Sequence, residues 1–597
     1  MLHVLYGSAT GTGQDVAEQI GRMATARHIP VIVSSMDAFD IHQLPALSHV
    51  VFVASSTGDG EAPENMTSTW KFLLRKSLAA DSLQAMKMAV FGLGDSSYAK
   101  YNAVARRLHA RLLQLGAVDI IGRGLGDDQH ELGYHGALNP WLDKLWSALL
   151  QMEPFILPPG FVVDDSPKPT PPKYVVQIVT DGAALTNVPD TRHTFYDQPK
   201  TALDGSHLIQ ATLTKNERLT AADWTQDVRH IELALPASSP TYSAGDIALL
   251  YPENVQTEAI DSFLNMTLQL PPSTQLFIRR IDGKPSGLPS RCTAEELMRQ
   301  YLDVFGTPRR SFFERLSLFT QDPDEKEKLM ELSAPEGADL LQDYCARERR
   351  TYIEVLQDFS TCHVPLEFLV ELIPCLAPRA YSIASSPNVH PRQVHLTVAI
   401  VDYLTPYKRH KKGVCSAWLE KLEAGATVPM RIKTGLFRLT SAIHSQNVIL
   451  IGPGTGIAVM RAIAQERQAQ RTHGTSVGDT HVYFGCRHRD KDFLYGDEWA
   501  QFAESGGITS FNVAFSRDQE DKVYVQAKLA EQKAAVFAVL SQGGYCFIAG
   551  SAKRMPSDVY SIIRDIIVSE GRVSGKEADA MMKSLVRQKR YIVGSWS

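Results

Sequence analysis

The stretch of residues 448–461 constrains the fold more than any other part of the sequence. It reads V-I-L-I-G-P-G-T-G-I-A-V-M-R: an apolar run typical of a buried strand, three closely spaced glycines, and a helical pattern. Glycine lets the backbone turn tightly and approach a ligand, and the first N–H groups of the following helix point at an anion. The stretch therefore predicts a strand-to-helix turn that holds a phosphate. A plain connection also fits, because the spacing is G-x-G-x-G rather than the G-x-G-x-x-G of dinucleotide-binding sheets.

Bulk properties narrow the class of protein. A chain of 597 residues is too long for one hydrophobic core and indicates roughly three to five domains. The net charge of −5 gives no general reason to expect nucleic acid as a partner. The seven cysteines form no C-x-x-C pair and are interpreted as free thiols of a reducing compartment. No apolar run reaches the about 18 residues of a membrane span, so we expect a soluble, cytoplasmic protein without a membrane anchor.

Residues 1–152 predict a first doubly wound α/β sheet. Apolar runs alternate with helical patterns, an order typical of parallel strands joined by helices. The runs lie at residues 2–6, 50–54, 88–92 and 118–121, and the helical patterns follow residues 13, 65, 101 and 140. Ligands of such sheets bind at the carboxyl ends of the strands, so the loops there are candidate sites.

Three of these loops, residues 8–13, 55–65 and 92–102, are rich in glycine and hydroxyl side chains. The first leads into a helix without a lysine. This suits a terminal phosphate held by backbone N–H groups and hydroxyls, and argues against an ATP site of the G-x-x-x-x-G-K type. Tyr98 offers a ring for stacking. A single loop of this kind is most simply a solvated turn, but three at successive strand ends favour a bound ligand.

Together with residues 124–128, these loops resemble the flavin mononucleotide (FMN) loops of flavodoxin-like domains in diflavin reductases. The resemblance implies that Tyr98 stacks on one face of the flavin. Thr57 stands where the family often has an aromatic ring, which leaves the other face more open. The residues assigned to FMN in this way are Ser8, Ala9, Thr10, Gly11, Thr12, Gly13, Ser55, Ser56, Thr57, Gly58, Leu93, Gly94, Asp95, Ser96, Ser97, Tyr98, Ala99, Lys100, Tyr101, Asn102 and Asp128.

The middle of the chain predicts a tether and then a barrel. Residues 153–205 are rich in proline and then polar and irregular, which predicts a tether on which the first domain swings. Strand-like runs at 207–214, 228–235 and 246–251 follow, helical patterns dominate residues 259–372, and strands resume near Arg379 and at 394–401. This order predicts a β-barrel with a helical insertion at about residues 257–375. The predicted domains are residues 1–152, 206–440 and 441–597.

Two short motifs carry chemistry in the barrel: Arg379-Ala-Tyr-Ser382 and Gly413-Val-Cys-Ser416. Considered singly, Arg379 is most simply a surface charge and Cys415 a buried small side chain. Together they resemble the R-x-Y-S and G-V-x-S motifs of ferredoxin-reductase-like flavin adenine dinucleotide (FAD) domains. The resemblance implies that the arginine and the second motif hold the pyrophosphate, that Tyr381 packs on the isoalloxazine, and that Ser382 lies close to flavin N5. The residues assigned to FAD are Arg347, Arg379, Ala380, Tyr381, Ser382, Gly413, Val414, Cys415, Ser416 and Trp596.

The basic run at residues 408–412 has two interpretations. It is most simply a solvated loop. A sharper hypothesis is that it docks the acidic edge formed by Asp59, Glu61 and Glu64.

Residues 445–597 predict a second doubly wound sheet, with strands at 448–451, 481–485, 508–515 and 545–549. Ser516, Arg517, Lys522 and Tyr524 follow its third strand. They suit an adenosine that bears a 2′-phosphate, because cations pair with the dianion and a ring stacks on adenine. This favours NADPH over NADH. The residues assigned to NADPH are Gly454, Thr455, Gly456, Ser516, Arg517, Lys522, Val523, Tyr524, Val525, Gln526 and Asp558.

The chain ends at Trp596-Ser597, with an aromatic residue where similar reductases stack a ring on FAD. Two departures lie nearby: Ala549 replaces a cysteine and Gly594 replaces an acidic residue of such relatives. Of the serine, cysteine and acid credited with assisting hydride transfer, only Ser382 remains. The departures bear on the rate of hydride transfer and not on cofactor binding.

The order of all these motifs resembles that of the small cytosolic NADPH-dependent diflavin oxidoreductases. The resemblance implies that electrons pass from NADPH to FAD, then singly to FMN, and then to a one-electron acceptor protein. It also implies that this acceptor is anamorsin, in cytosolic iron–sulfur protein assembly. Two alternatives stay open: a reductase for a haem protein, and a non-catalytic flavin-binding scaffold. Metal and hydrolase functions are not expected, since the sequence has no H-E-x-x-H, clustered Cys/His or G-x-S-x-G motif.

Overall fold

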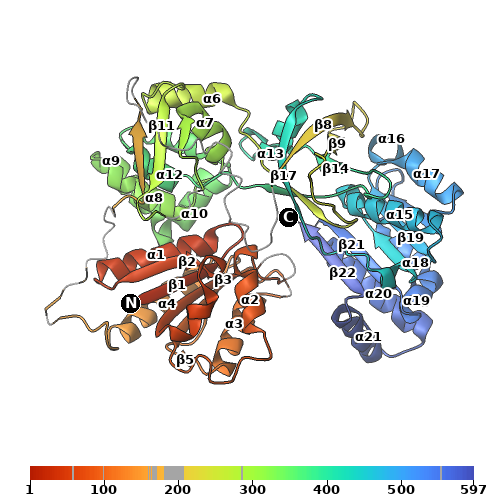
Figure 1. Ribbon diagram of the computed structural model, residues 1–597, viewed down its shortest axis with the longest axis horizontal. Helices are drawn as coiled ribbons and strands as arrows, with labels where there is room; N and C mark the ends of the chain where they lie inside the picture. Colours follow the sequence, from red (N-terminus) through yellow and green to blue (C-terminus); the bar gives the residue numbers. More distant parts are fainter. Residues whose placement is uncertain are drawn as a thin grey trace. The chain divides into compact units, whose positions relative to one another are not determined.

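The structure is a computed structural model that describes residues 1–56, 60–98, 100–158, 160–161, 163, 171–179, 208–283, 287–551 and 554–596. The chain forms two compact units (Figure 1). One comprises Met1–Val176, Arg279–Lys284 and Gly306–Ile373, and the other comprises Gln177–Ile278, Pro285–Phe305 and Pro374–Ser597. Among the described residues, no helix is both long and apolar enough to cross a lipid bilayer.

The first unit holds a parallel sheet of strand order β2-β1-β3-β4-β5, with β6 also paired to β4. The strands are β1 (Leu2–Gly7), β2 (Val31–Ser35), β3 (His49–Ser55), β4 (Lys87–Gly94), β5 (Val118–Asp119) and β6 (Gly124–Asp127). The predicted flavodoxin-like sheet is confirmed. The sequence pattern missed β2, because an edge strand that buries none of its residues fully shows little apolar contrast.

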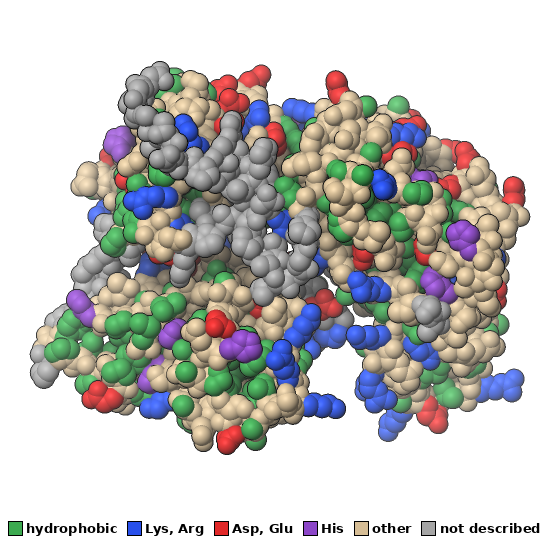
Figure 2. All heavy atoms as spheres, in the orientation of Figure 1, with side chains coloured by type: hydrophobic (Ala, Val, Ile, Leu, Met, Phe, Trp, Pro, Cys, Tyr) green, Lys and Arg blue, Asp and Glu red, His purple; other side chains and the backbone are tan. Residues whose placement is uncertain are grey.

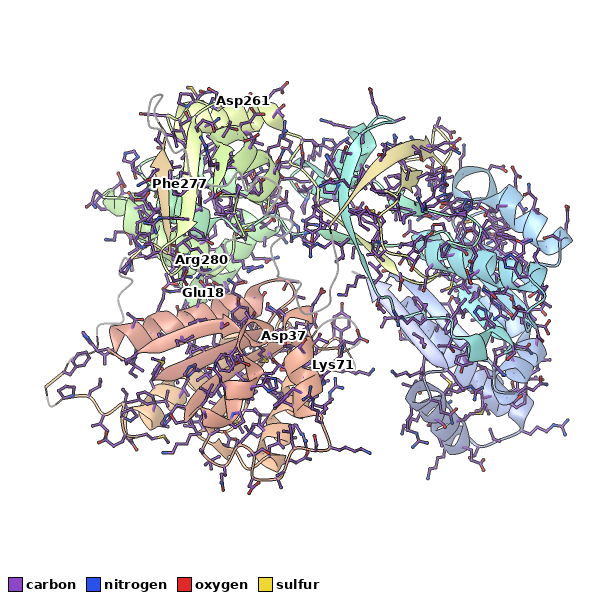
Figure 3. The ribbon with its side chains drawn as sticks, in the orientation of Figure 1. Glu18, Asp37, Lys71, Asp261, Phe277 and Arg280 are labelled. Carbon is purple, nitrogen blue, oxygen red and sulfur yellow. The ribbon has the colours of Figure 1, made fainter. Side chains whose placement is uncertain are left out.

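Helices cover both faces of this sheet (Figure 1). α1 (Thr12–Ala26) and α4 (His135–Leu149) share one hydrophobic core, and α2 (Thr67–Leu73) and α3 (Ala103–Gln114) share the other. α4 begins at His135, before the start predicted after Pro140. Asp37, labelled in Figure 3, accepts hydrogen bonds from the N–H groups of Ser68 and Thr69 at 2.9 and 2.8 Å, and so stabilises the start of α2.

The predicted helical insertion is confirmed as mainly helical, and most of it belongs to the first unit. Its helices are α6 (Thr257–Ser262), α7 (Ala294–Glu296), α8 (Arg310–Leu316), α9 (Pro323–Ser333), α10 (Ala338–Leu341), α11 (Tyr352–Asp358) and α12 (Leu366–Leu372). It also contains β11 (Gln275–Arg280) and β12 (Arg291–Thr293), which form a small sheet with β7 (Tyr174–Ile178). β7 lies inside the predicted tether, because its run Y-V-V-Q-I is apolar enough to pair.

The second unit contains an antiparallel barrel of strand order β13-β10-β17-β8-β9-β14. A bridge between Ile383 and Leu396 joins its two ends. The strands are β8 (Ile209–Arg218), β9 (Val228–Ala234), β10 (Ile247–Leu250), β13 (Arg379–Ser382), β14 (Gln393–Ala399) and β17 (Thr427–Lys433). Val394, Leu396 and Val398 point into the barrel core, so the residues between them point outward. α13 (Val414–Lys421) packs on this core.

The basic run at 408–412 is not simply a loop. His410–Lys412 forms β16, which pairs with β15 (Asp402–Leu404) in a two-stranded hairpin. Lys412 Nζ lies 3.2 Å from Glu420 Oε2 and 3.6 Å from Asp402 Oδ2. Lys412 is therefore paired with one carboxylate of the hairpin and one of α13, whereas the sequence predicted a lysine surrounded by solvent. Asp59, its predicted docking partner, lies outside the described residues.

The second sheet of this unit is parallel throughout, with strand order β20-β19-β18-β21-β22. Its strands are β18 (Val448–Ile451), β19 (Thr480–Cys486), β20 (Ser510–Phe515), β21 (Tyr545–Ser551) and β22 (Tyr591–Trp596). Its helices are α14 (Ser441–His444), α15 (Ile457–Thr472), α16 (Arg489–Asp492), α17 (Gly496–Glu504), α18 (Val525–Glu531), α19 (Lys533–Ser541), α20 (Met555–Gly571) and α21 (Gly575–Arg587). The predicted second doubly wound sheet is confirmed. α21 is amphipathic: Met582 and Leu585 are buried, and Lys and Arg side chains gather on its outer side (Figure 2).

Candidate functional site

Four strand ends of the first sheet meet at one edge, and the residues predicted to bind FMN follow them. The parallel register pairs Gly7 with Ala54, Ser55 with Leu93, and Gly94 with Asp127. The loops after β1, β3, β4 and β6 are therefore neighbours at the carboxyl edge, where ligands of such sheets bind. Of the predicted residues, Thr57, Gly58 and Ala99 lie outside the described part of the chain.

Ser8 holds the loop after β1 in shape. Its Oγ accepts hydrogen bonds from the N–H groups of Gly11 and Gly13, both at 3.0 Å. Its own N–H donates to Asn65 Oδ1 at 2.8 Å. Gly11, the residue before α1, has a φ of 91°, a conformation that favours glycine, and as a glycine it supplies no side-chain cap to the helix. The helix therefore presents backbone N–H groups and its positive dipole end to an anion.

The loops after β4 and β6 are tied to each other. Ser96 N–H donates to Asp127 Oδ1 at 2.9 Å, and Asn102 Nδ2 donates to Gly126 O at 2.8 Å. Asn102 is fully buried and has a φ of 52°, which asparagine tolerates better than most residues. These bonds fix the predicted third loop before any ligand binds.

Tyr98 and Asp128 lie at the same edge. The Tyr98 side chain is 44% exposed, so its ring is open to a planar ligand. Burial, together with the charges of Asp95 and Asp127, raises the pKa of Asp128 above its usual range. Burial thus disfavours the charged form of this one carboxyl at the edge.

In the barrel, the two predicted motifs meet directly. The side chain of Tyr381 on β13 lies close enough to Cys415 on α13 for each group to affect the pKa of the other. Burial raises the pKa of the Cys415 thiol to about 11 and also raises the pKa of Tyr381, so both groups are neutral at pH 7. Arg379 is half-buried and donates from Nη1 to Ala377 O at 2.6 Å. The strand thus brings a cation and a ring beside the start of α13.

The start of α13 is a close-packed turn that needs glycine. A Cβ on Gly413 would lie 2.8 Å from Val401 Cβ and 2.9 Å from Ser416 Oγ. Ser416 Oγ accepts a hydrogen bond from Val401 N–H at 3.1 Å, and no side chain of the described residues caps this helix. The turn therefore leaves helix N–H groups for a phosphate group.

The sequence reasoning did not single out Tyr403, which lies two residues after Val401, one of the contacts of Gly413. Tyr403 is 43% exposed and lines a cavity of about 530 Å³ together with Trp224 and Asp402. Tyr403 lies on the hairpin strand β15, outside the barrel sheet. Arg347, which was predicted to contact FAD, belongs to the first unit and pairs there with Asp343 at 2.7 Å.

The glycine loop after β18 is shaped by close backbone contacts. A Cβ on Gly452 would lie 2.7 Å from Gly456 O, and a Cβ on Gly456 would collide with Ala549 O. Gly454 has a φ of 56° and no atom within 4 Å of the position of its Cβ. The loop lies at the switch between β19 on one side of β18 and β21 on the other, where nucleotides bind in such sheets.

The predicted partners of the 2′-phosphate follow the strands beside this loop. The N–H groups of Ser516 and Arg517 donate to Cys486 O and Arg487 O, both at 2.9 Å, so the end of β20 lies along the end of β19. Arg517 and Lys522 are exposed, and Tyr524 is 53% exposed. In a separate contact, Gln526 Nε2 donates to Asp558 Oδ2 at 3.3 Å. The cations and the ring are thus accessible to a ligand.

A polar face of α15 links this loop to the FAD motif, and the sequence reasoning missed it. Arg461 Nη1 donates to Ala384 O at 2.6 Å, just after β13. Ser386 donates from N–H to Gln465 Oε1 at 3.0 Å and from Oγ to Glu466 Oε2 at 2.6 Å. All three α15 side chains are buried, although their spacing is that of an exposed helix face. Only the fold brings residues 384–386 to them.

The two departures from similar reductases are partners in the sheet. Ala549 on β21 lies opposite Gly594 on β22 in the register, and Ser551 lies opposite the backbone of Trp596. A Cβ on Gly594 would lie 2.7 Å from the ring of Phe437. An aromatic side chain therefore fills the space that an acidic side chain at position 594 would need.

Comparison with known families agrees with this architecture. Residues 4–141 match the flavodoxin family, residues 202–418 match the FAD binding domain family, and residues 450–560 match the oxidoreductase NAD-binding domain family. These three domains in this order define a flavoprotein oxidoreductase that uses FMN, FAD and NADPH.

Relatives with the same name cover the whole chain. The chain is 40% identical to NADPH-dependent diflavin oxidoreductase 1 of Mus musculus, over 100% of this chain and 99% of that protein. It is 39% identical to the proteins of that name from Danio rerio and Arabidopsis thaliana, with the same coverage. The chain belongs to the NADPH-dependent diflavin oxidoreductase family.

Proposed function

We propose that the strand-end loops of the first sheet bind FMN, that Arg379, Tyr381 and the start of α13 bind FAD, and that the loop before α15 binds NADPH together with Arg517 and Lys522. One observation carries the proposal. Each of the three domains has a helix start, at α1, α13 and α15, at which the N-cap residue is a glycine and supplies no side-chain cap. Each of the three cofactors has a phosphate or pyrophosphate to place there.

When bound, NADPH supplies a hydride, and the flavins convert this electron pair into single electrons. The chain's own residues bind and orient these groups. Ser382, Tyr381 and Trp596 are the proposed contacts on the FAD side, and Tyr98 is the proposed stacking residue on the FMN side. Phe437 occupies the space beside Gly594 that an acidic side chain at this position would need.

We further propose that the electron acceptor is anamorsin, in cytosolic iron–sulfur protein assembly. The support is the full-length similarity to diflavin oxidoreductases, and the seven cysteines, which form no disulfide and fit a reducing compartment. Stopped-flow mixing of the NADPH-reduced protein with purified anamorsin should show rapid one-electron reduction. Equal or faster reduction of an unrelated haem protein, with no reduction of anamorsin, would favour the alternative of a haem-protein reductase.

The preference for NADPH tests the nucleotide part of the proposal. Arg517→Ala should weaken NADPH binding about ten- to hundredfold, because a charge-assisted hydrogen bond to the 2′-phosphate is worth about 1.5–3 kcal/mol. Binding of NADH, which lacks that phosphate, should change little. KM values measured with both nucleotides check this, and an equal loss for NADH would contradict the assignment of Arg517.

A further inference from the structure

Two neighbouring strands of the barrel bring two histidines and a glutamate together, and none of the three belongs to the flavin or nucleotide motifs. His230 and Glu232 lie two residues apart on β9, and His395 on β14 is the register partner of Glu232. Ile231 and Leu396 point into the barrel core, so these three side chains share the outer face. His230 and His395 are buried, with 6% and 2% of their surface exposed.

The three side chains can each offer one ligand atom, and these atoms all lie within 4.8 Å of one another. His230 Nε2 and Glu232 Oε1 are 3.1 Å apart. The imidazole rings of His230 and His395 have centroids 5.0 Å apart and are nearly perpendicular, at 88°. In a tetrahedral zinc site with bonds of about 2.0–2.1 Å, neighbouring ligand atoms are about 3.4 Å apart. One pair is already close to this spacing, and rotation of side chains would have to bring the third ligand atom closer, since the three atoms lie within 4.8 Å of one another.

His395 has an unsatisfied nitrogen. Its Nδ1 is buried and has no hydrogen-bond partner among the described residues. Its Nε2 lies 3.3 Å from Gln393 Oε1, which can only accept, so the ring proton belongs on Nε2 and Nδ1 keeps its lone pair. A buried polar atom without a partner has lost its hydration without a compensating hydrogen bond. A metal ion accepts such a lone pair.

The surroundings orient one of the ligands. Tyr495 Oη lies 2.9 Å from His230 Nδ1 and 2.8 Å from Thr397 Oγ1, which fixes the ring so that Nε2 faces Glu232.

The nearby cations are paired elsewhere. Arg461 Nε lies 2.7 Å from Glu498 Oε2, and Lys215 Nζ lies 2.7 Å from Glu217 Oε2. The third histidine, His390, has its ring centroid 4.1 Å from that of His395, and its Nε2 lies 3.3 Å from Gln465 Nε2. The Glu232 side chain is 24% exposed, which gives an ion a route from solvent.

We propose that His230, Glu232 and His395 form a binding site for a divalent transition-metal ion of the zinc class. The two imidazoles and the carboxylate supply three ligands, and a water molecule completes the coordination. The site does not depend on the flavin or nucleotide assignments. The sequence did not predict it, because the histidines lie 165 positions apart in different strands and form no spacing motif.

The test uses the flavin-loaded, full-length protein after treatment with a chelator and removal of the chelator. Zinc chloride is then titrated in competition with a fluorescent zinc indicator, and bound zinc is counted by elemental analysis. The wild type should bind one zinc ion per chain. His395→Gln and Glu232→Gln should each weaken binding about ten- to hundredfold. His481→Gln is the matched control, because this half-buried histidine contacts Ser510 outside the cluster and should leave zinc binding unchanged.

Glu232→Gln keeps the shape of a partly exposed side chain, so it tests the site even if His395→Gln does not fold. Flavin content and the thermal unfolding temperature establish that each variant is folded. Zinc should also raise the unfolding temperature of the wild type but not that of Glu232→Gln, by mass action. Absence of stoichiometric zinc on the wild type, or equal zinc affinity in the wild type and Glu232→Gln, would overturn the proposal.

Discussion

At the scale of single residues, Ser8 is a side chain whose chemical role follows from its bonds. Its hydroxyl accepts from two backbone N–H groups and so shapes the loop before α1. Ser8→Ala removes both bonds, and at about 1 kcal/mol each the loss amounts to about thirtyfold in FMN affinity. Fluorescence titration of the apoprotein with FMN measures this. Ser82→Ala is the control, because its hydroxyl donates to Ala79 O at an exposed turn and has no other hydrogen bond among the described residues. Unchanged FMN affinity in Ser8→Ala would refute the role given to Ser8.

Arg461 makes a residue-scale prediction about stability. Its side chain is 6% exposed, and it bonds both Glu498 and Ala384 O. Arg461→Leu leaves the carboxylate of Glu498 without this cation in a partly buried site, and should destabilise the second unit by about 3 kcal/mol. The free energy of unfolding of the second unit is measured in urea, with hydrogen exchange of its amides as the readout. Arg438→Leu should have little effect, since Arg438 is exposed and bonds only Thr434.

These residues also show what sequence reasoning could find. Ser8, Tyr381 and Arg517 stand in short contiguous motifs, so the sequence and its resemblance to known motifs could propose them. Arg461, Gln465 and Glu466 have the spacing of a solvated helix face, and their partners lie about 80 positions earlier in the chain. Burial of a polar helix face depends on which strand covers it, and no local pattern records that.

At the scale of elements, the turn from β18 to α15 makes a paired prediction. In Gly456→Ala the new methyl group would collide with the backbone of β21, so the loop or the strand must move. In Gly454→Ala the methyl group meets open space, and the cost is limited to the positive φ, about 1 kcal/mol. Flavin reduction by NADPH should therefore be lost or strongly slowed in Gly456→Ala and be affected much less in Gly454→Ala. Equal rates in the two variants would contradict this account of the loop.

Elements were predictable where burial contrast is strong. The central strands β1, β3, β4 and β18 are almost fully buried and stand out as apolar runs. The edge strand β2, the hairpin strand β16 and the start of α4 were missed or misplaced. Edge strands and hairpins are stabilised by pairing more than by burial, so their sequences resemble loops.

At the scale of the whole molecule, the order of the domains follows from the order of the motifs. The compact unit to which the helical insertion belongs does not follow from that order. Residues 306–373 were predicted as an insertion into the barrel, and they cluster with the first domain. Arg22 on α1 lies 3.4 Å from Glu314 on α8, one of the ion pairs within that unit. Ion pairs between distant segments have no signature in either segment alone, so the sequence could not predict this grouping.

The central claim is that one chain takes electrons from NADPH and passes them through two flavins. Anaerobic titration of the purified protein with NADPH, combined with flavin release and chromatography, tests it most directly. The account predicts one FMN and one FAD per chain, and bleaching of both flavin absorbances as NADPH is added. Stoichiometric flavins whose absorbance NADPH does not bleach would instead identify a flavin-binding scaffold, and would contradict the claim.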